Sequence, residues 1–91
     1  MNTQAAVRQQ IREFVMETLA KPKGVASLSD DDYLIQKGAI DSLGIFKLVA
    51  FLEETFSLRI SDDEITPEHL QSISTIERLV LLKLEARSAP Q

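Results

Sequence analysis

The 91-residue chain contains no cysteine and no tryptophan, and it has a single histidine, His69, and a single tyrosine, Tyr33. Without cysteine, the chain cannot form disulfides, thiolate nucleophiles or cysteine-held metal centres. The sequence also lacks a Gly-x-Ser-x-Gly elbow and a phosphate-cradling glycine loop. Most assemblies for nucleophilic, thiol or metal chemistry therefore cannot be built, and we expect a protein that is not itself an enzyme.

Basic clusters and long hydrophobic runs are also missing. The formal net charge is −4, which argues against nucleic acid or anionic membrane partners and favours basic protein surfaces. No apolar run approaches the ~18 residues that span a bilayer, and the first residues do not resemble an export signal. The 44% apolar content suits a single small globular domain over residues 1–91. We expect a cytoplasmic protein that is monomeric and does not insert into membranes.

The first part of the chain has the spacing of an amphipathic helix. Its apolar residues recur at helical intervals: Val7, Ile11, Phe14, Val15 and Leu19. The pattern predicts a helix over residues 3–20, closed by Lys21-Pro22-Lys23-Gly24 because proline interrupts the hydrogen-bond ladder and glycine suits a helix end. A long loop over residues 25–41 should follow, held on the core by apolar side chains: Leu28, Leu34, Ile35 and Ile40.

A second helix is predicted from about Ser42 to Phe56, with two apolar stripes that point in different directions. One stripe should enter the core: Ile45, Leu48, Val49, Leu52 and Phe56. The other lies beside Lys47 and Glu54 and consists of Leu43, Phe46 and Ala50. Only one stripe can pack inward, so the second should remain exposed.

Two further helices are expected after an extended stretch at residues 57–60. Thr66 should cap a short helix that begins at Pro67 and runs through Leu70. Ser74 and Glu77 match a capping box for a last helix that ends near Ala86. Its inward residues are predicted to be Ile73, Ile76, Val80 and Leu84, widened by Leu79, Leu81 and Leu82. The predicted fold is all-α: a small bundle of three main helices and one short helix, with a structured core over residues 3–86 and a flexible tail at 87–91.

Ser42 stands where the long loop meets the second helix. A serine there can cap the helix, which stabilises it by about 1 kcal/mol. The same free N–H groups would also favour a phosphate joined to the hydroxyl by about 0.3–1 kcal/mol. Asp30-Asp31-Asp32 lacks the glycine and alternating ligands of a calcium loop, so we expect a solvated run or a turn cap and no specific metal. No function is assigned to His69.

The residues around Ser42 resemble a known family. Gly38-Ala39-Ile40-Asp41-Ser42-Leu43, followed by a helix that ends in Phe51-Leu52-Glu53-Glu54-Thr55-Phe56 and then by residues 58–65, is similar to acyl carrier proteins of the phosphopantetheine-binding class. The resemblance implies that a phosphopantetheinyl transferase joins 4′-phosphopantetheine from coenzyme A to Ser42. Acyl or aminoacyl groups would then be bound to the thiol of the arm as thioesters. Asp41 would help the transferase to recognise the site.

The resemblance also implies partner enzymes and a surface that receives them. The partners would be an acyl- or aminoacyl-activating ligase and downstream synthase or transferase enzymes. They would dock on residues of the second helix: Leu43, Phe46, Lys47, Ala50, Glu53 and Glu54. Carriers of fatty-acid synthesis usually have acidic residues where Gly44 and Lys47 stand. Residues 63–68 instead resemble discrete carriers served by dedicated adenylating ligases in specialised pathways. A carrier of general fatty-acid synthesis and an unmodified helical interaction module are the alternatives.

Overall fold

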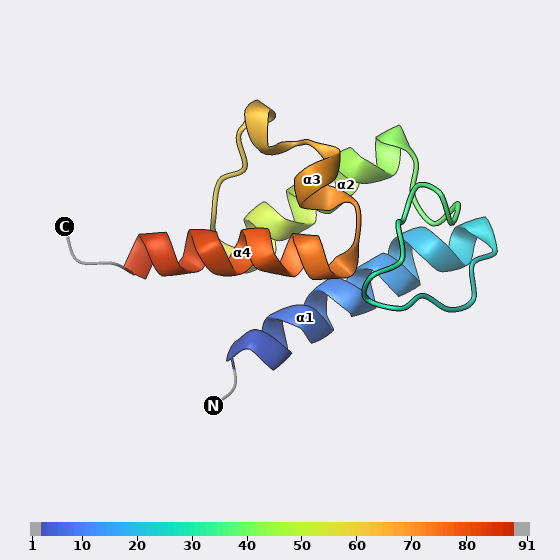
Figure 1. The fold of residues 1–91 in the computed structure, drawn as a ribbon, viewed down its shortest axis with the longest axis horizontal. Helices are drawn as coiled ribbons and strands as arrows, with labels where there is room; N and C mark the ends of the chain where they lie inside the picture. Colours follow the sequence, from blue (N-terminus) through green and yellow to red (C-terminus); the bar gives the residue numbers. More distant parts are fainter. Residues whose placement is uncertain (1–2, 89–91) are drawn as a thin grey trace.

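A computed structural model describes residues 3–88, and within them every regular element is helical. Helix α1 (Thr3–Phe14) continues through a π-helical turn (Val15–Ala20) and a 3-10 turn (Lys21–Lys23). Helix α2 (Ser42–Phe56), a 3-10 turn (Asp62–Glu64), helix α3 (Pro67–Leu70) and helix α4 (Ile73–Ser88) follow. Figure 1 shows the long connection between the first helix and α2. The predicted all-α bundle, with three main helices and a short one, is confirmed.

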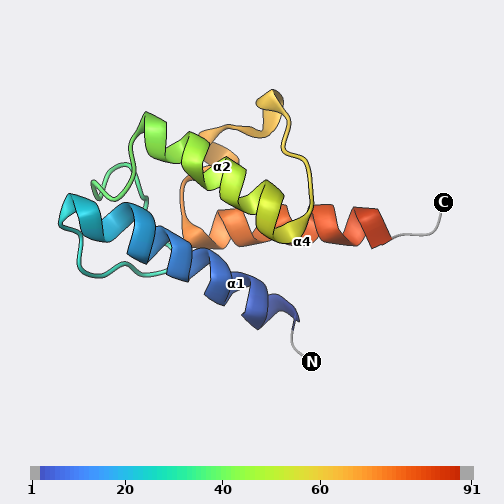
Figure 2. The same cartoon turned by 180° about the vertical axis from the view of Figure 1, so that it is seen from behind.

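Helices α1, α2 and α4 enclose one core (Figures 1 and 2). The rings of Phe14 and Phe51 stack with centroids 4.1 Å apart, which fixes α1 against α2. The largest fully buried side chains come from all three helices and the long loop: Ile11, Val15, Leu34, Leu48, Leu52, Ile73, Ile76 and Val80. Among the described residues, no helix is long and apolar enough to cross a membrane.

The first helix ends where the sequence predicts. Gly24 adopts a left-handed conformation (φ 82°), and its N–H donates to the Lys21 carbonyl, the arrangement of a helix terminus. The π-helical turn was not predicted. Its wider spacing turns both Leu19 and Ala20 inward, and both are buried.

Apolar side chains and backbone hydrogen bonds hold the long loop on the core. Leu28, Leu34 and Ile40 are buried, as predicted. The Leu34 N–H donates to the Gln71 carbonyl at 2.8 Å. The prediction for Ile35 is wrong, since its side chain is 56% exposed. Leu34 takes the core position at this point of the loop, and its neighbour Ile35 turns away.

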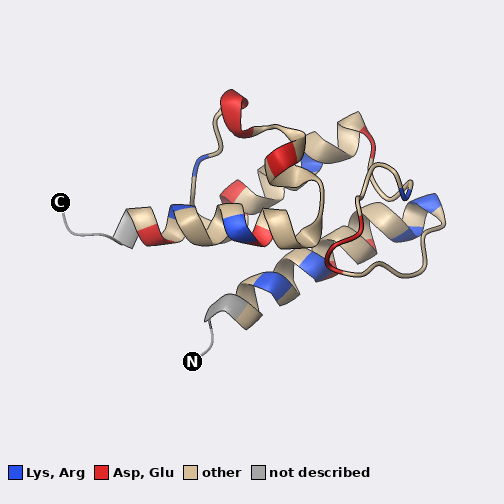
Figure 3. Ribbon diagram, in the orientation of Figure 1, with Lys and Arg blue, Asp and Glu red and all other residues tan. Residues whose placement is uncertain are grey.

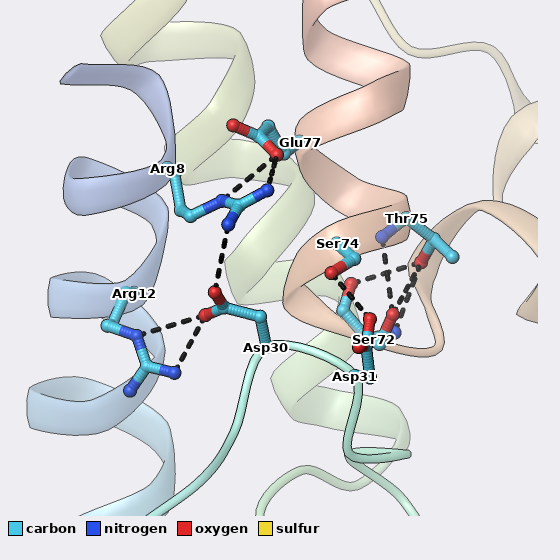
Figure 4. A network of polar contacts seen from close by, with 8 residues as sticks. All are labelled: Arg8, Arg12, Asp30, Asp31, Ser72, Ser74, Thr75 and Glu77. Carbon is cyan, nitrogen blue, oxygen red and sulfur yellow. Dashed lines mark hydrogen bonds and ion pairs between the residues drawn. The ribbon is translucent and has the colours of Figure 1, made fainter. Parts of the chain in front are cut away.

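Two of the loop aspartates, Asp30 and Asp31, bind side chains of α1 and α4 (Figure 4). Asp30 accepts from Arg12 at 2.7 Å and pairs with Arg8 at 3.1 Å. Arg8 also reaches Glu77 on α4 at 2.6 Å, so a single guanidinium joins α1 to the loop and to α4. Asp31 accepts from the Ser74 hydroxyl at 2.8 Å.

Asp32 caps the turn that the aspartate run was expected to form. Its carboxylate accepts from the Ser29 N–H at 2.9 Å, and this bond is the main reason that its pKa lies below the ordinary value. The interpretation of the aspartate run as a cap is therefore confirmed for Asp32 alone, because Asp30 and Asp31 bind side chains of other elements.

The start of α4 differs from the prediction. The capping box of Ser74 and Glu77 is wrong, because the helix begins earlier, at Ile73. Ser72 and Thr75 bond reciprocally there: the Ser72 N–H donates to Thr75 Oγ1 at 3.1 Å, and the Thr75 N–H donates to Ser72 Oγ at 3.2 Å. The Ser74 hydroxyl instead donates to Asp31, and the Glu77 carboxylate pairs with Arg8.

Two smaller predictions about the second half of the chain also fail. Thr66 precedes α3 in extended conformation, but its hydroxyl lies 3.0 Å from Nδ1 of His69 and makes no capping bond to the backbone. Leu82 is 57% exposed and does not widen the inward stripe of α4. Helix α4 itself extends to Ser88, and the part of the expected tail at residues 89–91 lies outside the described residues.

Candidate functional site at the start of α2

Asp41 caps α2, and Ser42 is the first helical residue. The backbone of Asp41 is extended, and its Oδ1 accepts from the Gly44 N–H at 2.8 Å. The interpretation of Ser42 as the cap is therefore wrong. The Ser42 side chain is exposed, and within residues 3–88 its hydroxyl makes no hydrogen bond. The structure thus presents an uncommitted hydroxyl beside the N–H groups that begin the helix.

A lysine from the far side of the long loop reaches this site. The ammonium of Lys23 lies 2.7 Å from Oδ2 of Asp41. This contact, followed by the bond from the Gly44 N–H, holds the pKa of Asp41 below its ordinary value. The carboxylate is therefore ionised at neutral pH and has two partners within the chain. Sequence reasoning missed Lys23 because nothing in a linear pattern pairs residues across so long a loop.

Gly44 permits a close approach between the loop and α2. A Cβ atom at this position would lie 2.7 Å from Cγ1 of Ile40 and 3.3 Å from Oδ1 of Asp41. Contacts under 3.0 Å require the neighbours to move. Ile40 is itself buried, so it has little freedom to do so. The glycine therefore lets the loop close tightly just before Ser42.

The predicted exposed stripe of α2 is confirmed. Leu43 is 65% exposed and Phe46 is 64% exposed. Lys47, Ala50 and Glu54 are exposed on the same side. We call the surface formed by these five residues, Leu43, Phe46, Lys47, Ala50 and Glu54, the α2 face.

Glu53 does not join the α2 face. It is partly buried, and its carboxylate accepts from the Ile60 N–H at 2.8 Å, across the turn that follows the helix. The structure thus separates Glu53 from the other predicted docking residues and gives its carboxylate a role within the chain.

A cleft of about 210 Å³ opens on the other side of α2 from the α2 face. Ile45 lines it one helical turn after Ser42, and Ile35 and Leu70 face it from the loop and from α3. Two glutamines, Gln36 and Gln71, add amide groups to its wall. Sequence reasoning missed this cleft. The one feature of the sequence that points to the cleft is Ile35, an apolar loop residue that is not buried in the core.

No family model matches the chain. The chain is 31% identical over 83 residues to Aminoacyl carrier protein 1 of Bradyrhizobium diazoefficiens, a match that covers 91% of this chain and 91% of that protein. It is 29% identical over 87 residues to Aminoacyl carrier protein 2 of the same organism, which covers 96% of this chain and 97% of that protein.

Similarity along almost the whole chain, together with the small helical bundle, defines a carrier protein. The chain belongs to the acyl carrier protein family. Its role is that of a carrier protein.

Proposed function

We propose that this protein carries acyl or aminoacyl groups on a 4′-phosphopantetheine arm attached to Ser42. The observation that carries the proposal is the state of the Ser42 hydroxyl: it is exposed, begins α2 and takes no part in capping. The arm, when bound, supplies the thiol that the chain lacks and that holds the cargo as a thioester. We expect the protein to act as a monomer and to leave the chemistry to its partners.

The residues around Ser42 suit a phosphodiester at this hydroxyl. Asp41 uses the Gly44 N–H, while the N–H groups of Ser42 and Leu43 begin the helix and have no acceptor within the described residues. Such groups and the helix dipole favour an anion by about 0.3–1 kcal/mol at an exposed site. Asp41 has 55% of its side-chain surface exposed, which leaves it open to contact by the transferase that we expect to recognise it.

The relatives favour an aminoacyl cargo, because both are named aminoacyl carrier proteins. In this reading an adenylating ligase activates an amino acid and loads it on the arm, and a downstream synthase or transferase receives it. Tethering makes the later transfer effectively intramolecular and raises the local concentration of the cargo. The pathway that we propose is therefore a specialised one served by a dedicated ligase, and not general fatty-acid synthesis.

Intact mass spectrometry tests the proposal. The apo-protein is incubated with coenzyme A and a broad-specificity phosphopantetheinyl transferase, and we expect the mass to rise by one phosphopantetheinyl group. Ser42→Ala should stay unmodified. Ser27→Ala, which alters another exposed serine, should be modified like the wild type.

Two results would overturn the proposal: no mass increase in the wild type, or an equal increase in Ser42→Ala. No mass increase would favour an unmodified helical interaction module that binds partners through the α2 face, and an equal increase in Ser42→Ala would put the arm on another residue. For an unmodified interaction module, Ser42→Ala would leave partner binding unchanged.

A further inference from the structure

Three carboxylates of α2 and its flanking segments are already bound within the chain. Asp41 pairs with Lys23 at 2.7 Å. Glu53 accepts from the Ile60 N–H at 2.8 Å. Glu64, in the turn that follows α2, pairs with Lys83 at 2.8 Å. A basic partner surface would have to compete with these internal contacts.

Much of the negative charge lies away from the start of α2. Figure 3 shows acidic segments at the 3-10 turn Asp62–Glu64 and on α3, and a basic segment near the beginning of α2. The net charge of −4 is therefore a poor guide to the surface beside Ser42. Local charge, and not the total, decides which surface can approach an interface closely.

Lys47 is the charged group at the centre of the α2 face. It is exposed, and within residues 3–88 it makes no ion pair. It lies one helical turn from Leu43, so the two side chains share one side of the helix. The acid of the same face, Glu54, lies two further turns along, about 10 Å from Lys47 in helical rise. The part of the α2 face nearest Ser42 is thus apolar and cationic.

Resting on the proposed function, we propose that the enzyme that loads the arm receives Leu43 and Phe46 in an apolar depression bordered by a carboxylate that pairs with Lys47. An enzyme that acts on a group tethered to Ser42 approaches the start of α2, where these side chains lie. Covering Lys47 without an opposite charge would be costly, and placing a cation against it would add repulsion. The loading enzyme is therefore acidic at this point of contact.

The test uses the holo-protein, prepared with the broad-specificity transferase, and an adenylating ligase that aminoacylates it. The ligase activates a radiolabelled amino acid with ATP, and the rate at which the label is transferred to the carrier gives kcat/KM. We expect Lys47→Glu to lower kcat/KM by about tenfold or more, and added salt to raise the residual rate by screening the repulsion. Lys47→Arg should keep most of the wild-type value, and Lys47→Ala should fall between the two.

Arg78→Glu is the matched control, because it makes the same change in charge at an exposed residue of α4. It should leave kcat/KM within about twofold of the wild type. The proposal is overturned if Lys47→Glu is as fast as Lys47→Arg, or if Lys47→Glu and Lys47→Ala lose activity equally. Failure of the proposed function is seen separately, since the wild type would then gain no arm in the transferase step.

Discussion

Lys23 and Asp41 form an ion pair, with 2.7 Å between Nζ and Oδ2, that joins the two ends of the long loop. Because the pKa of Asp41 is lowered in the folded protein, the stabilisation it provides is present above the ordinary pKa and is lost as the pH falls through the folded-state value. The pair thus links the last residues of the first helical segment to the cap of the helix that begins at Ser42.

Replacing Lys23 by methionine should raise the pKa of Asp41 and reduce the loss of stability in acid. The amide of Gly44 remains as a partner, so the pKa should stay below its ordinary value. Carbon chemical shifts of the Asp41 carboxyl group, followed by NMR from neutral to acid pH, measure the change. Lys21→Met is the control, because Lys21 pairs with Glu17 and not with Asp41. An unchanged Asp41 titration in Lys23→Met would show that the ion pair has no effect in solution.

Gly44→Ala should destabilise the protein by about 1 kcal/mol. The new methyl gains up to about 1 kcal/mol of helix propensity, but overpacking against Ile40 typically costs about 1–3 kcal/mol. Urea unfolding measures the difference. In a double-mutant cycle, Ile40→Ala should cost less in the Gly44→Ala background than in the wild type, because it removes the clashing carbon. Additive effects in this cycle would contradict the close approach seen here.

Arg8→Met should lower the melting temperature more than Arg78→Met. Removing Arg8 leaves the carboxylate of Glu77, whose side chain is only 9% exposed, without its guanidinium partner. It also removes the ion pair between Arg8 and Asp30, so amide hydrogen exchange should increase in the loop over residues 25–41. Arg78 is exposed and serves as the control. Equal melting temperatures for the two variants would rule out a supporting role for the network.

Lys83→Met should raise the pKa of Glu64 from about 2 toward the ordinary value of 4.5. The hydrogen bond from Lys83 is the main cause of the shift, and the bond from the Ser61 N–H is the second. The stabilisation from Glu64 is present above pH 4.5 and is lost as the pH falls toward 2. NMR titration of the Glu64 carboxyl group in the wild type and in Lys83→Met measures this change. A Glu64 pKa that stays near 2 in the variant would assign the shift to Ser61 alone.

The bounds of α2 could be read from the sequence because its apolar residues repeat with helical period over the whole segment. Period alone also separated the buried side of that helix, such as Leu48 and Leu52, from exposed Leu43 and Phe46. The position of Ser42 where the loop meets the helix marked it as a candidate, and the family resemblance implied its role.

Contacts between distant residues could not be predicted in this way. The bonds from Lys23 to Asp41 and from Ile60 to Glu53 depend on how the chain folds back. The capping box at Ser74 and Glu77 failed for a local reason as well, since Ser72 and Thr75 make the reciprocal bonds at an earlier helix start, and partners on the loop and on α1 bind Ser74 and Glu77. Local patterns list what a residue can bind, and the tertiary fold selects among those options.

The wide turn at Val15–Ala20 has a consequence for how this chain tolerates changes in length. A π-helical turn holds extra chain relative to an α-helix. Deleting one residue there, such as exposed Thr18, can relax the turn to α-helical form while the segments before and after keep their orientation. The same deletion within α1 would rotate everything beyond it by about 100°. Natural variants that are one residue shorter before Lys23 are therefore expected to have lost it from this turn.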